Sequence, residues 1–206
     1  EVLSRNSRMV QQKIKQANFP VLKTLDGFDF KAIPGLDQRR VVELATCEYV
    51  TNKSNVIAVG NSGTGKTHIS IALGMAACQK GISTLFTTAA TLVNELLEAR
   101  EERKLLHLQK RLNTPRLLII DELGFVPFSK AGAELLFEVI SSRYEQGSII
   151  ITSNLPFQDW TQVFGCQRLT GALLDRLTHH VQILEMNAES YRFTQSKQKQ
   201  QKQKAA

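Results

Sequence analysis

Residues 60–67 read Gly60-Asn61-Ser62-Gly63-Thr64-Gly65-Lys66-Thr67, which is the pattern G-x-x-x-x-G-K-T. An apolar run at residues 55–59 comes before this segment and predicts a strand, and a helix-forming run follows it. In that context the glycines let successive backbone amides point inward, and the positive end of the helix dipole faces the same space. The segment therefore predicts a phosphate-binding loop for a nucleoside triphosphate.

The loop carries two side chains with expected roles. We expect Lys66 to bridge the β- and γ-phosphates of ATP and the Thr67 hydroxyl to ligate Mg²⁺. The complete set of candidate nucleotide-binding residues is Gly60, Asn61, Ser62, Gly63, Thr64, Gly65, Lys66, Thr67 and His68.

Two further strands place polar side chains beside the loop. The run at residues 117–120 is apolar and ends in Asp121-Glu122. Because parallel strands end at one edge of a sheet, we expect Asp121 on the magnesium side and Glu122, across the pleat, as the base that orients water. Asn154 follows the apolar strand at residues 149–153 and could hold that water or sense the γ-phosphate. Together these residues predict ATP hydrolysis.

Strands and helices alternate outward from this centre. We expect strands at 55–60, 83–88, 117–121, 148–153 and 181–186, and helices at 37–50, 66–79, 90–112 (as one helix or as two), 130–145 and 169–178. This alternation predicts an α/β fold in which helices cover both faces of a five-stranded parallel sheet. The predicted organisation is a basic linker arm at 1–36, an ATPase core at 37–194 and a disordered basic tail at 195–206.

Charge and composition narrow the partners. The 206 residues carry a formal charge of +7, and residues 100–116 hold six Lys or Arg against two Asp or Glu. An anionic polymer such as DNA is the natural partner for this layout, although solvated charged faces are also common. Apolar runs are too short to span a membrane, and three widely spaced cysteines indicate a reducing compartment. We therefore expect a cytoplasmic protein without disulfides, structural zinc or a membrane anchor.

The motifs together resemble a known family. They are GNSGTGKTHISIALG, LLIIDELGFVPFS, AELLFEVISSRYE, IIITSNLPFQDWTQVFG, ALLDRLTHH and ESYR, with NFPVLKTLDGFDF ahead of them. This set is similar to the IstB-like ATPases, which are transposition helpers encoded beside the transposase in insertion sequences. That family is related to the DnaC and DnaI helicase loaders within the AAA+ class of P-loop NTPases.

The resemblance implies roles that spacing alone does not show. It makes Asn154 the sensor-1 residue, Arg176 an arginine finger that completes a neighbouring subunit's ATP site, and Arg192 the sensor-2 residue. An ordinary ion pair on a helix surface is the alternative for both arginines. The chain after Met186 is too short to build the helical lid that many AAA+ proteins carry.

The basic segment at 91–116 corresponds in this resemblance to a helical insertion that faces DNA. Its candidate contacts to the phosphate backbone are Arg100, Arg103, Lys104, Lys110 and Arg111, and the segment has no aromatic residue for base stacking. The alternative is an amphipathic core helix with its leucines inward, and both interpretations can hold at once.

Three functions compete. The first is an ATP-dependent helper of a transposase that assembles as an oligomer on duplex DNA. The second is a helicase loader with the same ATPase and single-stranded DNA as ligand. A small-molecule kinase is disfavoured because the chain lacks an Arg-rich phosphate lid and because Asp121-Glu122, Asn154 and Arg176 would have no purpose in it.

Overall fold

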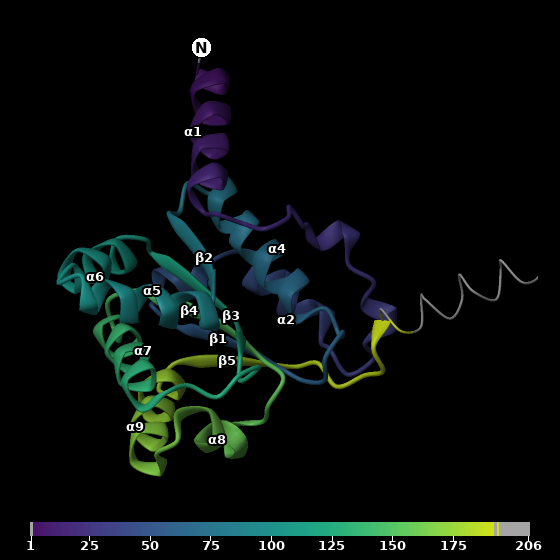
Figure 1. Ribbon diagram of the computed structural model, residues 1–206. Helices are drawn as coiled ribbons and strands as arrows, with labels where there is room; N and C mark the ends of the chain where they lie inside the picture. The colour runs from purple at the N-terminus through teal and green to yellow at the C-terminus, as the bar shows by residue number, and fades with distance from the viewer. Residues whose placement is uncertain (1, 192, 194–206) are drawn as a thin grey trace, which may run out of the picture.

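Five parallel strands form the centre of the computed structural model, which describes residues 2–191 and 193, with side chains from residue 6 on (Figure 1). The strands are β1 (Asn55–Val59), β2 (Thr84–Thr88), β3 (Leu117–Leu123), β4 (Ser148–Ser153) and β5 (Val181–Glu185). Their order across the sheet is β2-β3-β4-β1-β5. The predicted α/β fold with a five-stranded parallel sheet is therefore confirmed.

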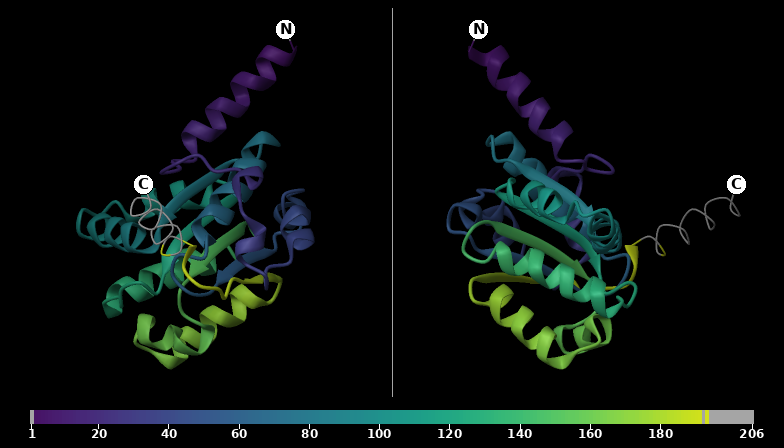
Figure 2. Two further views of the ribbon diagram at one scale, coloured as in Figure 1. Left: turned by 90° about the vertical axis from the view of Figure 1, so that its right-hand side faces the viewer. Right: turned by 60° about the vertical axis from the view of Figure 1, so that its left-hand side comes forward.

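Helices cover both faces of the sheet because successive strand residues point to opposite sides. In β3, Leu117 and Ile119 pack with α2 (Gln38–Leu44), α3 (Glu48–Thr51) and α4 (Lys66–Gln79). Leu118 and Ile120 pack on the other side with α5 (Ala89–Glu101), α6 (Leu105–Asn113), α7 (Lys130–Ser142), α8 (Trp160–Phe164) and α9 (Gln167–Thr178). Figure 2 shows this layered arrangement from two sides.

The amino-terminal segment differs from the expected linker. Helix α1 spans Val2–Gln16 and projects away from the sheet in all views (Figures 1 and 2). Val10 and Ile14 lie one turn apart and are partly buried, and Ala17 is fully buried, so the base of the helix is anchored on the core. The short turns η1 (Leu25–Gly27) and η2 (Phe30–Ala32) then lead to α2.

Two predicted helices are interrupted. Asp37 caps α2 by accepting a 2.9 Å hydrogen bond from the amide of Arg39, but Cys47 adopts a left-handed φ of 63° and separates α2 from α3. The predicted helix at 90–112 forms α5 and α6, which are joined through Arg103 with a φ of 58°. We call α5, α6 and their connection the α5–α6 hairpin.

A buried arginine attaches this hairpin to the sheet. The guanidinium of Arg143 donates to the carbonyls of Leu112 at 2.8 Å, Pro115 at 2.9 Å and Ser148 at 3.1 Å. Burial lowers the pKa of Arg143 to about 10. Backbone carbonyls at the end of α6 and the start of β4 therefore solvate this cation, and it fixes where the hairpin meets the sheet.

The described chain beyond β5 is short. No helical lid follows Glu185 within the described residues. Arg192 and the predicted tail at 195–206 lie outside those residues. In the part of the chain that is described, no helix has both the length and the apolar character needed to cross a bilayer.

Candidate functional site

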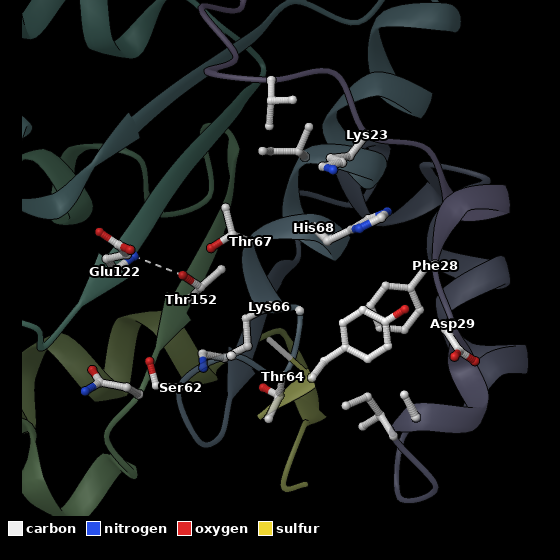
Figure 3. Close-up of a pocket in the computed structure, with 18 of the residues that line it drawn as sticks. Lys23, Phe28, Asp29, Ser62, Thr64, Lys66, Thr67, His68, Glu122 and Thr152 are labelled. Atoms are coloured by element: carbon white, nitrogen blue, oxygen red, sulfur yellow. Dashed lines mark hydrogen bonds between the residues drawn. The ribbon is translucent and has the colours of Figure 1, made fainter. Parts of the chain in front are cut away.

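A cavity of about 350 Å³ lies at the carboxyl ends of β1, β3 and β4 (Figure 3). The phosphate loop and the start of α4 form its floor through Ser62, Gly63, Thr64, Gly65, Lys66, Thr67 and His68. Glu122, Thr152 and Asn154 line one wall, and residues from the 21–33 segment line another. Figure 3 shows Glu122 and Thr152 on one side of the start of α4, and His68, Phe28 and Asp29 on the other.

The loop wraps around the Lys66 side chain. Its Nζ donates to the carbonyls of Gly60 and Asn61, both at 2.7 Å, and the residue is 9% exposed. Gly65 has a φ of 86°, and a Cβ there would lie 2.6 Å from the Phe28 ring. Gly63 has a φ of 82°, and a Cβ there would lie 2.2 Å from the Ser190 hydroxyl oxygen, while the Gly63 carbonyl accepts a 3.1 Å hydrogen bond from the Tyr191 amide. Both glycines are therefore required by backbone conformation and by close approach.

Thr67 and Asp121 lie together below the loop. The Thr67 hydroxyl lies 2.9 Å and 3.1 Å from the two Asp121 carboxylate oxygens, and Asp121 is 3% exposed. Burial raises the pKa of Asp121, although hydrogen bonds from Thr152 and Thr67 and the charge of Lys66 oppose the shift. A hydroxyl and a carboxylate are hard oxygen donors of the kind that Mg²⁺ prefers, so these two side chains fit that ion.

Glu122 reaches the cavity by a route that the alternating pleat did not predict. The β3–β4 ladder is irregular between Ile120 and Leu123, and Glu122 has a left-handed φ of 59°. Its amide donates to the Thr152 hydroxyl at 2.9 Å, which leaves its exposed side chain on the cavity wall. Asn154, just past β4, lines the same wall. The structure thus brings Glu122 and Asn154 together with Lys66 and Thr67.

Arg176 lies elsewhere. Its guanidinium donates to the Ala172 carbonyl at 3.0 Å and lies 5.0 Å from the centroid of the Phe137 ring. It shares a small cavity with Asn55, which begins β1, whereas the phosphate loop follows the end of that strand. Arg176 therefore lies at the amino-terminal ends of the strands, whereas the phosphate loop of the same chain lies at their carboxyl ends.

The five basic residues predicted to contact DNA all lie exposed on the α5–α6 hairpin, and none lines the cavity. Lys104 pairs with Glu102 at 2.7 Å, and Arg111 pairs with Glu95 at 2.5 Å. Among the described residues, no ion pair joins Arg100, Arg103 or Lys110 to a carboxylate. The structure therefore divides the five into two paired and three unpaired cations.

The residues that sequence reasoning missed belong to the wall formed by the 21–33 segment. They include Lys23, Phe28 and Ile33. Phe28 packs edge-on against Phe30 and against His68. The sequence signal for this wall is the Leu25–Phe30 run of apolar and aromatic residues in a polar segment, which favours docking on the core but does not indicate where. Tyr191 also lines the cavity.

Known proteins match this chain along nearly its whole length. The family model described as IstB-like ATP binding protein matches residues 1–200. A protein of Geobacillus stearothermophilus, named for insertion sequence IS5376 and for ATP binding, is 42% identical over 99% of this chain and 81% of its own length.

Two solved structures share the fold. AMPPCP-bound DnaA from Aquifex aeolicus superposes with a TM-score of 0.70 at 20% identity and covers 90% of this chain. This chain spans 56% of that DnaA chain, little more than half its length. The DnaC helicase loader has a TM-score of 0.60 at 21% identity and covers 84% of this chain and 98% of its own. These likenesses confirm the expected α/β fold.

The family match includes the residues that form the cavity. It takes in the phosphate loop, the strand that ends in Asp121 and Glu122, and the 21–33 segment. The resemblance stated from the motifs is thereby confirmed. The chain belongs to the IstB-like ATP-binding protein family.

Proposed function

We propose that this protein is a cytoplasmic, Mg²⁺-dependent ATPase that assists a transposase, assembling as an oligomer on duplex DNA and switching when ATP is hydrolysed to ADP and phosphate. One observation carries the proposal. Lys66, Thr67, Glu122 and Asn154 come from three separate elements and meet at one cavity. A phosphate cradle, an oxygen site for a divalent cation and a carboxylate base are the parts that hydrolysis requires.

In this proposal ATP would occupy the cavity along its length. The triphosphate would lie over the phosphate loop, where Lys66 would exchange its two carbonyl contacts for phosphate oxygens. Thr67 and Asp121 would hold Mg²⁺, which supplies charge neutralisation to the phosphates when bound. The adenine base of ATP would pack against the cavity wall that contains Phe28 and Ile33.

Glu122 and Asn154 would act on the attacking water. The Glu122 carboxylate would orient the water and accept its proton, while the Asn154 amide would hold the water or sense the γ-phosphate. The hydrogen bond from the Glu122 amide to Thr152 fixes the backbone that carries this base, because Thr152 lies on the neighbouring strand.

Arg176 would act on a neighbouring subunit. Negative charge spreads over the phosphoryl oxygens as the γ-phosphate is transferred, and a cation opposite them stabilises this charge. Since Arg176 lies at the far edge of the sheet from its own loop, its geometry supports a contact in trans rather than in cis. The family places the sensor-2 role on Arg192, which lies outside the described residues.

The choice of partner rests on the relatives. The 42% identical protein is named for an insertion sequence, which favours a cognate transposase over a replicative helicase as partner. The likeness to DnaC, at 21% identity, supports the fold alone. The exposed cations of the α5–α6 hairpin suit contacts to the phosphate backbone.

The deciding experiment measures ATP hydrolysis without DNA, with single-stranded DNA and with duplex DNA, beside sizing by light scattering with a non-hydrolysable ATP analogue. We expect duplex DNA to stimulate hydrolysis and the analogue to produce an oligomer. Stimulation by single-stranded DNA alone would favour the helicase-loader function. A monomer at every nucleotide state would contradict the oligomer.

A further inference from the structure

His68 joins the phosphate-loop helix to the amino-terminal segment. It lies in the first turn of α4, directly after Lys66 and Thr67, and its Nε2 lies 2.8 Å from the Thr24 carbonyl oxygen. A carbonyl can only accept a hydrogen bond, so Nε2 carries the proton in this contact. The imidazole therefore donates from the helix that holds the phosphates to a segment that lies about forty residues earlier in the chain.

The segment held in this way carries a wall of the cavity. Phe28 lies at its end, with its ring 5.2 Å from the His68 ring, centroid to centroid, at an interplanar angle of 78°. The same ring covers Gly65 of the phosphate loop. Figure 3 shows His68 and Phe28 side by side at the edge of the cavity.

Apolar packing and one long-range hydrogen bond hold this segment in place. Leu25 and Phe28 are partly buried and pack against the hydrophobic core. The turn η1 contains no buried residue, and the Phe28 amide bonds locally to the Leu25 carbonyl. Within the described residues, the hydrogen bond between His68 and Thr24 is the one that links Thr24–Phe28 to a distant part of the chain. A segment that is only partly buried and has one long-range hydrogen bond is expected to loosen when that bond is lost.

We infer that His68 is a positioning residue that holds Thr24–Phe28 as the base-side wall of the nucleotide cavity, and so sets the affinity for the base of ATP rather than for its phosphates. This inference rests on the proposed function, because it assumes that ATP occupies the cavity. The inference gives different roles to consecutive residues of α4. Lys66 and Thr67 would act on the phosphates of ATP, whereas His68 would act through Phe28 on the adenine base.

The test compares dissociation constants for ATP and for inorganic tripolyphosphate by calorimetry. His68→Ala removes the donor and should weaken ATP binding about two- to tenfold, the range expected for one net hydrogen bond, while tripolyphosphate binding stays unchanged. His68→Asn should behave like His68→Ala, because its short amide cannot reach the position of Nε2. His68→Gln carries an amide nitrogen close to that position and should restore ATP affinity.

Hydrogen exchange without nucleotide supplies a second readout. Amides at residues 24–28 should exchange faster in His68→Ala than in the parent protein and His68→Gln. Equal weakening of ATP and tripolyphosphate, or parent-like ATP binding by His68→Ala, would overturn the inference. Should His68→Ala lose its fold by circular dichroism, Phe28→Leu must show the same split between the two ligands, and its absence overturns the inference as well.

The two proposals fail differently. A parent protein that binds neither ATP nor tripolyphosphate contradicts the proposed function itself. A parent protein that binds both, beside an unaffected His68→Ala, contradicts the role of His68 alone.

Discussion

The phosphate-loop cavity and the α5–α6 hairpin both depend on charged side chains, but they use them differently. In the cavity, Lys66 and Asp121 are nearly buried, and several hydrogen bonds fix each of them. On the hairpin, all five candidate cations are exposed, and two are already paired with carboxylates of the same hairpin. In the cavity, the proposed roles depend on where the charged side chains are held. On the hairpin, they depend on whether each cation is free to contact a phosphate.

This difference explains why the two regions respond differently to sequence reasoning. A glycine-rich motif specifies a backbone path, so its side chains follow from the pattern. A surplus of Lys and Arg specifies only a composition, and pairs such as Lys104 with Glu102 depend on which rotamers meet on the folded surface. An exposed pair is worth little in stability, yet it still competes with an external phosphate for the cation.

The largest effect should come from Arg176. In the proposed mechanism this arginine completes the ATP site of a neighbouring subunit, whose own cavity supplies Lys66 but, among the described residues, no arginine finger. Arg176→Ala should bind ATP nearly normally and hydrolyse it about 10³- to 10⁵-fold more slowly. Mixing it with Lys66→Ala should restore part of the activity, since one protein retains the loop and the other retains the finger. A mixture that co-assembles by light scattering and remains inactive would rule out a trans-acting finger.

The second effect tests position inside the cavity. Glu122→Gln should retain ATP affinity and slow single-turnover hydrolysis about 10²- to 10⁴-fold, because the amide cannot accept the proton of water. Lys66→Ala is the matched contrast, and it should weaken ATP binding itself in a calorimetric titration. Hydrolysis by Glu122→Gln at the parent rate would remove Glu122 from the mechanism.

The third effect tests availability on the hairpin. Neutralising Arg100, Arg103 and Lys110 to Gln should reduce the magnitude of the negative slope of log affinity for duplex DNA against log salt by about 2.7, at about 0.9 for each lost phosphate contact. Neutralising the paired Lys104 and Arg111 should reduce it by less than about 0.9 per residue, and so by less than about 1.8 in all. Fluorescence anisotropy at several salt concentrations measures both. Equal effects per residue would show that ion pairing on the hairpin does not limit DNA contact.

The smallest effect concerns stability. Because burial raises the pKa of Asp121 above its value in the unfolded chain, the contribution of this carboxyl to stability is complete at low pH and is lost as pH rises through the folded pKa. Asp121→Asn mimics the protonated form, so it should be more stable than the parent protein at neutral pH without Mg²⁺ or nucleotide. Urea unfolding at several pH values should show the gap closing as pH falls.

A hairpin variant is the control for this measurement. Glu102→Gln changes an exposed carboxyl and should leave urea unfolding unchanged at neutral pH. A destabilised Asp121→Asn would mean that the hydrogen bonds from Thr67 and Thr152 outweigh the cost of burying the charge.

Much of the fold follows from local pattern, and much of the cavity does not. Apolar runs and helical periods located all five strands, and the loop residues follow from their motif. The kink that turns Glu122 into the cavity had no sequence signal, because a bulge depends on pairing between β3 and β4. The Phe28 wall was missed for a similar reason: it forms only when a segment docks on a loop far along the chain. Helix α1 was missed because its polar composition obscured the partly buried Val10 and Ile14.

The contact between Gly63 and the Ser190–Tyr191 segment also affects when the site can form during synthesis. The loop leaves the ribosome roughly 130 residues before Ser190, which corresponds to about 7 to 25 seconds at typical elongation rates. Strand β1, which carries the loop, lies between β4 and β5, and β5 is the last strand to be made. A nascent chain therefore displays the complete G-x-x-x-x-G-K-T motif long before it can assemble the site. The complete cavity, with Tyr191 in its lining, can therefore form only after the last strand of the sheet has been synthesised.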